Sequence, residues 1–370
     1  MNTFSLRTRL YSGEGSLDVL RRFQNKHIWI ICDGFLARST MFDALKGALA
    51  ADNQISVFSD ITPDPTTGTV VQGISQMQSL KPQVVIGFGG GSALDAAKAI
   101  VWFSRQSGVE IETCIAIPTT SGTGSEVTCA CVITDPDKGI KYPLFNAELY
   151  PDIAILDPTL VVSVPANITA NTGMDVLTHA IEAYVSPKAS DFTDALAEKA
   201  AQLVFRYLPT AVKKGDCLAT RGKMHNASTL AGMAFSQAGL GLNHAIAHQF
   251  GGQFHLPHGL ANALLLTAVI RFNAADTRAM RRYARLARAC HLCPDSANDT
   301  SSLNALLQHI EQLKKHCAIP HLASALSEQR ADYSKRIPAM VQAALADVTL
   351  ATNPRRADGQ AISELLEELL

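Results

Sequence analysis

The sequence predicts an α/β N-terminal domain built on a parallel sheet, followed by an all-helical C-terminal domain. Before about Val164, short apolar runs rich in β-forming residues alternate with segments of helical spacing, and after it strand-like runs nearly vanish. A chain of 370 residues also suits two domains better than one ordinary core. We therefore expect domains over residues 1–164 and 165–370.

The first part is expected to alternate strands and helices. Its strand-like runs are mostly continuous apolar stretches, which is typical of a parallel sheet covered on both faces. The expected strands are 27–32, 54–58, 84–88 and 114–117. The expected helices between them are 41–49, 67–79 and 93–103.

The second part is expected to be helical throughout. The segment 161–173 contains two asparagines, a proline and a glycine, and is the candidate hinge between the two parts. Helical patterns follow over 174–185, 192–207, 223–235, 244–250 and 260–272, and continue toward the C-terminus.

Composition excludes several classes of partner. Charged residues make up 18% of the chain and the formal net charge is −1, so no basic field exists to hold nucleic acid. The first residues lack an apolar signal segment, and no uninterrupted apolar stretch reaches the roughly 18 residues that a membrane span needs. We expect a soluble, cytoplasmic protein that binds no membrane and acts on a small molecule.

The eight cysteines are scattered through apolar surroundings, which favours reduced thiols over a disulfide framework. Cys290 and Cys293 form a lone CxxC. A structural zinc site would need a second pair, and none follows, so we interpret both as thiols.

A glycine turn after the expected strand 84–88 is a candidate phosphate site. Gly89, Gly90, Gly91 and Ser92 precede a helical pattern, and a helix start offers free backbone N–H groups and a positive dipole end. We expect Ser92 to cap that helix. A serine stands where the Rossmann GxGxxG motif has its third glycine, so a tight turn without a ligand stays an alternative.

A loop rich in hydroxyl groups follows the next expected strand. Residues 117–126 carry five hydroxyl side chains and two glycines, and can line phosphates or ribose. Loops at the ends of successive parallel strands meet at one sheet edge, where α/β proteins bind ligands. Asp33, at the end of the first expected strand, could accept from a ribose 2′-hydroxyl and would repel a 2′-phosphate, which favours NAD over NADP. A surface loop and an ordinary loop aspartate are the alternatives.

The helical part contains a candidate metal site. Asp175 and His179 are four residues apart on one expected helix, so both project from one face, and His244 and His248 repeat that spacing. His258 could add a further ligand. One carboxylate with three imidazoles suits Fe²⁺ or Zn²⁺ better than Mg²⁺ or Ca²⁺. Spacing alone leaves open which residues bind, and a single histidine of this kind is more often a core or capping residue.

The spacing of His244 and His248 also occurs in zinc peptidases. Those enzymes carry a glutamate base directly after the first histidine of HExxH, and this chain has Ala245 there. A metallopeptidase is therefore disfavoured.

Five motifs in this sequence resemble the iron-containing, metal-dependent alcohol dehydrogenases. They stand in the family's order and run nearly from end to end. The motifs are GGGSALDAAKAI (89–100), PTTSGTGSEVT (118–128), GMDVLTHAIEAYV (173–185), AGLGLNHAIAHQFGGQFHLPHGLANALLL (238–266) and TNPRR (352–356).

The resemblance implies a role for individual residues. The family's metal ligands fall on Asp175, His179, His244 and His258, and its further histidine near the nicotinamide, which is not normally a ligand, falls on His248. The implied dinucleotide contacts are Asp33, Gly89, Gly90, Gly91, Ser92, Thr119, Thr120, Thr123, Lys141 and Leu160. Asp64 departs from the asparagine of many family members, and His255 receives no role beyond a place near the mouth of the site.

The resemblance also implies an activity. Stretches such as GKMHNASTLAGMAFSQAGLGLNHAIAHQ are similar to the family branch of bacterial propanediol-utilisation microcompartments. This implies NADH-dependent, reversible reduction of a short-chain aldehyde, propionaldehyde to 1-propanol, with NAD(H) and Fe²⁺ or Zn²⁺ as cofactors. It further implies a homo-oligomer, a dimer, inside a microcompartment, with shell or cargo proteins as partners.

The same residues leave other functions open as alternatives. A zinc glycerol-dehydrogenase-like oxidoreductase or a lyase similar to dehydroquinate synthase would share the fold, but PTTSGTGSE and TNPR argue against both. A shell-binding protein with a vestigial site is a different class, and the intact ligand set disfavours it.

Overall fold

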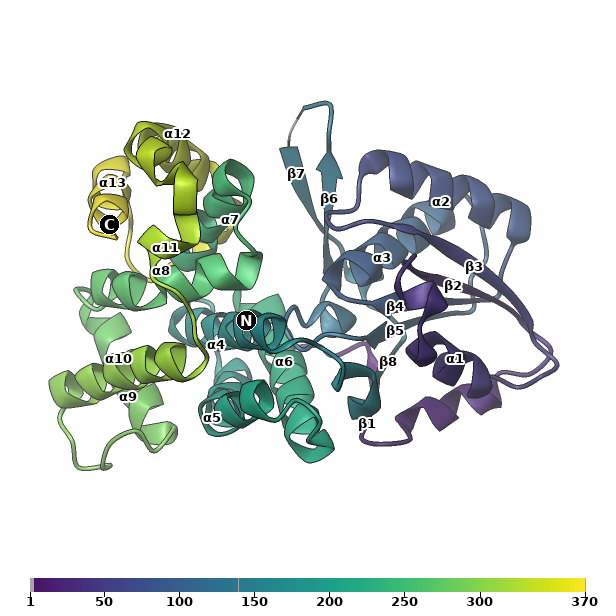
Figure 1. The fold of residues 1–370 in the computed structure, drawn as a ribbon, viewed down its shortest axis with the longest axis horizontal. Helices are drawn as coiled ribbons and strands as arrows, with labels where there is room; N and C mark the ends of the chain where they lie inside the picture. Colours follow the sequence, from purple (N-terminus) through teal and green to yellow (C-terminus); the bar gives the residue numbers. More distant parts are fainter. Residues whose placement is uncertain (1–2, 139, 370) are drawn as a thin grey trace. The chain divides into compact units, whose positions relative to one another are not determined.

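The computed structural model describes residues 3–138 and 140–369. Contacts between residues divide the chain into two compact units (Figure 1). The unit that we call the sheet unit comprises Ser5–Ser163 and Asp216–Gly232, and the helical unit comprises Val164–Gly215 and the chain from Met233 onward, together with Phe4. The segment 216–232 therefore returns to the sheet unit from within the second half of the sequence, which the sequence did not indicate.

A six-stranded parallel sheet forms the centre of the sheet unit, in the order β1-β8-β5-β4-β2-β3. This confirms the expected α/β class with a parallel sheet. The strands are β1 (Arg9–Ser12), β2 (His27–Asp33), β3 (Gln54–Ile61), β4 (Val84–Gly89), β5 (Thr113–Pro118) and β8 (Ile153–Leu156).

Both faces of the sheet are buried, as continuous apolar strands require. In β2, Ile28 and Ile30 belong to one hydrophobic cluster, and Trp29 and Ile31 belong to the other. All four side chains are fully buried. The covering helices are α1 (Thr40–Gly47), α2 (Thr67–Leu80) and α3 (Gly91–Gln106).

The sequence did not predict four of the strands. β1 and β8 are only four residues long. They pair with each other although they are far apart in the sequence, so that Arg9 lies beside Ile153. β6 (Ala130–Asp135) and β7 (Ile140–Phe145) form a separate antiparallel pair that includes Pro143. A proline within a short run argues against a strand, but it is tolerated here because β7 is an edge strand of a two-stranded sheet.

Every regular element after Val161 in the described residues is a helix, as expected for the second half. The helices are α4 (Ala166–Val185), α5 (Asp191–Lys213), α6 (Leu218–Ala238), α7 (Leu242–Phe254), α8 (His258–Asn273), α9 (Thr277–Ala289), α10 (Asp299–His316), α11 (Leu322–Leu326), α12 (Tyr333–Ala346) and α13 (Gly359–Glu367). α4 begins directly after Pro165, so most of the expected hinge 161–173 is its first two turns. None of the helices in the described ranges is long and apolar enough to cross a membrane.

All eight cysteines are free thiols. Burial raises the pKa of the Cys114 and Cys131 thiols to about 12, so both are uncharged at neutral pH. Neither has the thiolate character that a reactive cysteine needs.

Candidate metal centre

Four side chains of the helical unit converge on one point. Asp175 and His179 come from α4, His244 comes from the first turn of α7, and His258 is the first residue of α8. One ligand atom from each lies within 4.8 Å of the others. Asp175 Oδ1 lies 3.7 Å from His244 Nε2, 3.6 Å from His258 Nε2 and 4.0 Å from His179 Nε2.

Close packing of α8 against α4 brings His258 to this point. The next residue, Gly259, lies so near the carbonyl of Asn171 on α4 that a β-carbon would collide with backbone. Glycine is therefore required where the two helices approach. The spacing of Asp175 and His179, predicted from the sequence, puts both on the buried face of α4.

The cluster is closed on one side and open on the other. The side chains of Asp175, His179 and His244 are at most 5% exposed, whereas His258 is 43% exposed and the neighbouring His248 is 37% exposed. The His248 and His258 rings stack with centroids 5.4 Å apart. A substrate would therefore approach from the side of these two histidines.

Charge within the cluster is balanced between the aspartate and the imidazoles. Burial by itself raises the pKa of Asp175, but His179, His258 and His244 outweigh it and hold this pKa well below its usual range. Burial opposes a charge on His244, yet the carboxylate of Glu182 outweighs it and raises the pKa of His244 to about 9. Three imidazole nitrogens and one carboxylate oxygen form a donor set that fits Fe²⁺ or Zn²⁺.

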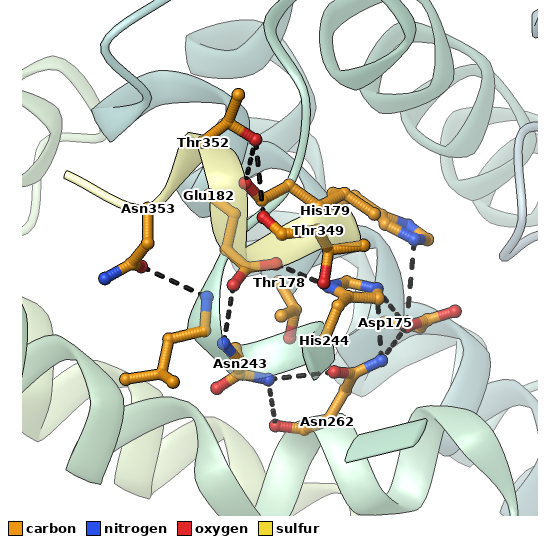
Figure 2. Close-up of polar contacts among 12 residues, drawn as sticks. Asp175, Thr178, His179, Glu182, Asn243, His244, Asn262, Thr349, Thr352 and Asn353 are labelled. Carbon is orange, nitrogen blue, oxygen red and sulfur yellow. Dashed lines mark hydrogen bonds and ion pairs between the residues drawn. The ribbon is translucent and has the colours of Figure 1, made fainter. Parts of the chain in front are cut away.

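A second layer of polar side chains contacts the candidate ligands Asp175 and His244 (Figure 2), and the sequence did not identify it. His244 Nδ1 donates to Glu182 Oε2, and Asn262 Nδ2 donates to Asp175 Oδ1 at 2.7 Å. Asn262 is itself fixed by Asn243, whose Nδ2 donates to Asn262 Oδ1 at 2.8 Å. Spacing places Glu182 three residues after His179 and Asn262 four residues after His258, but it does not reveal their contacts with His244 and Asp175.

His248 is held by a carboxylate outside the cluster. Its Nδ1 lies 2.7 Å from Asp347 Oδ2, and Asp347 is the N-cap residue of the 3-10 helix Val348–Thr352. Burial raises the pKa of Asp347, but the hydrogen bond and charge of His248 outweigh it and lower that pKa overall. His255 is the C-cap residue of α7 and has a left-handed backbone conformation with a φ of 56°. Its place in the structure is therefore that of a helix-ending residue.

The TNPRR motif completes the start of α7. The N-cap residue Gly241 has no side chain to offer, and Asn353 Oδ1 accepts from Leu242 N at 3.1 Å instead. Thr352 Oγ1 donates to Leu240 O at 2.6 Å in the loop before the helix. The helix that carries His244 is therefore positioned by residues far along the chain.

In the sheet unit, the two expected cofactor loops follow neighbouring strands. Gly89 at the end of β4 pairs with Pro118 at the end of β5, and Thr119 N donates to Gly89 O at 2.9 Å. The hydroxyl group of Thr120 lies 3.5 Å from where a β-carbon on Gly90 would stand. The structure therefore brings the glycine turn and the hydroxyl loop together at one sheet edge.

The expectation that Ser92 caps α3 is wrong. The N-cap residue is Gly90, which makes no side-chain cap, and Ser92 lies within the first turn. Ser92 Oγ accepts from Asp64 N at 3.3 Å, and Asp64 Oδ1 forms an ion pair with Lys141 Nζ at 2.6 Å. Asp64 has a φ of 56°, a conformation that aspartate and asparagine tolerate better than most residues.

The remaining expected cofactor residues have clear structural surroundings. Asp33 Oδ1 accepts from the backbone N–H groups of Phe35 and Leu36 and so fixes the turn after β2. Thr123 Oγ1 accepts from Ser125 N at 3.3 Å. Leu160 is buried in a hydrophobic cluster of the sheet.

The hydroxyl loop is anchored by the returning segment 216–232. Ser121 Oγ lies 2.9 Å from His225 Nδ1, and Thr229 Oγ1 donates to Glu126 Oε1 at 2.6 Å. A β-carbon on Gly124 would lie 2.6 Å from Gly232 Cα, so backbone touches backbone there.

Comparison with known proteins identifies the family. A model of the Fe-containing alcohol dehydrogenase family, C-terminal part, matches residues 169–370, and a model of the iron-containing alcohol dehydrogenases matches residues 7–158. The chain belongs to the iron-containing alcohol dehydrogenases. It is therefore an oxidoreductase that interconverts alcohols and aldehydes, and its donor set fits the iron of the family name.

Relatives of this alcohol dehydrogenase match along its whole length. The 1-propanol dehydrogenases PduQ of Citrobacter freundii and of Salmonella typhimurium are each 80% identical to it, over 100% of both chains. A solved 1,3-propanediol oxidoreductase superposes with a TM-score of 0.93 at 30% identity over 100% of both chains. A sulfoacetaldehyde reductase from Bifidobacterium kashiwanohense, solved with NAD⁺, has a TM-score of 0.87 at 28% identity, covering 100% of this chain and 98% of its own.

Proposed function

We propose that the enzyme reduces propionaldehyde to 1-propanol with NADH, reversibly, and so returns NAD⁺ to the degradation of 1,2-propanediol. The observation that carries this proposal is the 80% identity, over the full length, to two proteins named 1-propanol dehydrogenase. The cofactors are NAD(H) and Fe²⁺.

The dinucleotide is assigned to the sheet unit. Its pyrophosphate is assigned to Gly89–Ser92 at the start of α3, where backbone N–H groups and the helix dipole favour an anion. The side chains assigned to the rest of the cofactor are Asp33, Thr119, Thr120, Thr123, Lys141 and Leu160. Asp33 would repel a 2′-phosphate, which supports NADH over NADPH.

The metal is assigned to Asp175, His179, His244 and His258 in the helical unit. When bound, Fe²⁺ supplies Lewis acidity that stabilises negative charge on the carbonyl oxygen. The buried side chains of Asp175, His179 and His244 exclude water from the closed side of the cluster, and His258 borders the open side.

His248 is assigned a role in orientation or proton transfer at the open side. Because a carboxylate accepts only, Asp347 holds the His248 ring with Nδ1 as donor, which leaves Nε2 to accept a proton or a hydrogen bond.

The domains are proposed as residues 1–164 for the dinucleotide and 165–370 for the metal, with the segment 216–232 packed on the sheet unit. We also propose a dimer inside a bacterial microcompartment, in contact with shell or cargo proteins, because the sequence resembles the family branch of propanediol-utilisation microcompartments. Sedimentation of the pure enzyme and its presence in purified microcompartments would test these two points.

The activity is tested by NADH oxidation at 340 nm with metal-free enzyme, with and without added Fe²⁺. We expect activity with propionaldehyde, dependence on Fe²⁺, and a lower kcat/KM with NADPH. Acetaldehyde, butyraldehyde and dihydroxyacetone complete the series, since a preference for dihydroxyacetone would favour the glycerol-dehydrogenase alternative. A rate of NADH oxidation that does not change when Fe²⁺ is added would contradict the proposal. An equal kcat/KM with NADPH and NADH would also contradict it.

Metal content of two variants separates the roles of the histidines. We expect His244→Ala to lose the metal and His248→Ala to keep it while losing activity. The assignment is wrong if His248→Ala empties the site and His244→Ala leaves it full.

A further inference from the structure

Glu182 makes two contacts with the first turn of α7, and both use its carboxylate (Figure 2). Oε1 accepts from Asn243 N at 2.8 Å, and Oε2 accepts from Nδ1 of His244. The side chain of Glu182 is only 5% exposed, so water does not compete for either oxygen. The same carboxylate therefore binds the helix backbone and the ring of a candidate ligand.

The start of α7 is built to receive this carboxylate. Gly241 is its N-cap residue, and a β-carbon there would lie 3.0 Å from Glu182 Oε1 and 2.8 Å from Asn353 Oδ1. Glycine thus lets two side chains from other parts of the chain cap the helix. A negative charge at a helix N-terminus is favourable because it meets unpaired N–H groups and the positive end of the dipole.

The contact with Glu182 also fixes which nitrogen of His244 carries hydrogen. An ionised carboxylate can only accept, so in the neutral ring, the form that binds a metal, Nδ1 holds the hydrogen and Nε2 keeps its lone pair. An independent contact agrees, because the amide nitrogen of Asn262 can only donate and lies 3.2 Å from His244 Nε2. The amide orientation follows from Asn243 Nδ2, which donates to Asn262 Oδ1 at 2.8 Å.

We propose that Glu182 is a positioning residue of the metal centre: it keeps His244 in the tautomer that offers Nε2 to the metal, and it caps the helix that carries this ligand. The inference rests on the proposed metal site and adds a carboxylate behind one of its ligands. Such outer partners raise ligand basicity and fix ring orientation, and their loss weakens metal binding about 10- to 100-fold.

The test is the substitution Glu182→Gln, which keeps the shape and removes one acceptor. A glutamine amide has a single acceptor oxygen, so it cannot accept from both Asn243 N and His244 Nδ1. If its nitrogen faces the ring, it donates to Nδ1 and favours the tautomer that has hydrogen on Nε2. The matched control is Glu198→Gln. Glu198 also contacts α4, where its carboxylate accepts from the Tyr184 hydroxyl at 2.6 Å, and among the described residues its ion pair is with Arg285 and not with a candidate ligand.

The measurement is Zn²⁺ affinity of metal-free protein by competition with a chromophoric chelator, beside apo-protein melting curves. We expect Glu182→Gln to bind Zn²⁺ about 10- to 100-fold more weakly than wild type, and Glu198→Gln to bind like wild type. Glu182→Asp keeps the charge and should recover part of the affinity. Long-range ¹H–¹⁵N spectra of ¹⁵N-histidine protein should report Nδ1–H at His244 in wild type and its loss in Glu182→Gln.

Three outcomes would overturn the inference. They are equal Zn²⁺ affinity of Glu182→Gln and wild type, equal losses in Glu182→Gln and Glu198→Gln, and an unchanged His244 tautomer in the glutamine variant. If Glu182→Gln does not fold, the aspartate variant decides, because wild-type affinity with a lost Nδ1–H signal would also contradict the proposal. A wild-type protein that binds no Zn²⁺ would instead refute the proposed metal site itself.

Discussion

His225 shows how one buried side chain can govern the response of the sheet unit to acid. This residue is 1% exposed, and its Nδ1 lies 2.9 Å from the hydroxyl of Ser121 in the expected cofactor loop. Burial lowers the pKa of His225 from 6.5 to about 4, so the folded protein holds it neutral. An unfolded chain would protonate it at a higher pH.

We therefore predict a loss of stability in acid that depends on His225. The contribution of the neutral His225 to the free energy of unfolding is fully present above the unfolded pKa of 6.5. It is lost as the pH falls toward the folded pKa of about 4, and the loss is about 3 kcal/mol in total. Urea unfolding of metal-free protein at pH 7, 5.5 and 4 measures this. His225→Asn should lose much less stability over that range than wild type.

His291→Asn, at an exposed position, is the matched control and should follow wild type. If His225→Asn and wild type lose stability in parallel between pH 7 and 4, then the burial of His225 has no such effect.

The candidate ligands could be predicted from sequence, whereas the side chains behind them could not. Asp175 and His179 are neighbours on one helix, so spacing alone put them together. Glu182 stands on the same helix, but its partners Asn243 and His244 lie 61 and 62 residues away. Only tertiary packing selects such partners, and a glutamate in a helical pattern reads as an ordinary helix residue.

At the scale of the element, α7 depends on caps from elsewhere in the chain. We predict that Gly241→Ala destabilises the protein by about 1–3 kcal/mol, because its β-carbon would crowd Asn353 Oδ1 at 2.8 Å and Glu182 Oε1 at 3.0 Å. The displaced carboxylate should also weaken metal binding. Urea unfolding and Zn²⁺ titration measure the two effects.

Gly252→Ala provides the control within the same helix. Nothing lies within 4 Å of its added β-carbon, so this change should stabilise α7 by about 0.5–1 kcal/mol and leave metal affinity unchanged. Equal effects of the two substitutions would contradict the role given to Gly241.

Long periodic segments were predicted well and short or locally ambiguous ones were not. β4 and α3 follow from an apolar run and a helical pattern, and both occur as expected. β8 has only four residues, too few for a pattern, and exists through its pairing with β1 and β5. The first turns of α4 read as a hinge, yet they are helical, and Thr169 and Ala170 are buried there.

At the scale of the whole molecule, we expect the two compact units to differ in their dependence on metal. All four candidate ligands belong to the helical unit, and the expected cofactor loops belong to the sheet unit. Binding to the folded state stabilises it by about 4 kcal/mol when free metal exceeds Kd a thousandfold.

We predict that removal of the metal loosens the helical unit selectively. Hydrogen exchange with mass spectrometry should show faster exchange in α4, α7 and α8 after chelation, while β2, β4 and β5 keep their protection. Asp175→Asn should resemble the chelated wild type even with metal present. Uniform acceleration across both units would show that the metal acts on the whole fold.

The packing of the segment 216–232 on the sheet unit could not be predicted from the sequence. The helical pattern over 223–235 is continuous, so nothing in it indicates that the chain up to Gly232 packs on the sheet unit. The chain packs there because the backbones of Gly124 and Gly232 approach each other closely, although the two glycines are more than a hundred residues apart in the sequence.

The cap that Asn353 places on α7 has a consequence for the order of events during synthesis. Asn353 follows Leu242 by 111 residues, which take a ribosome roughly 6 to 22 s to add at about 5–20 residues per second. Throughout that interval, the nascent segment that carries His244 exists without this partner. If the growing chain bound metal during this interval, the start of α7 would still be incompletely formed. Metal binding is therefore favoured after translation has passed Asn353.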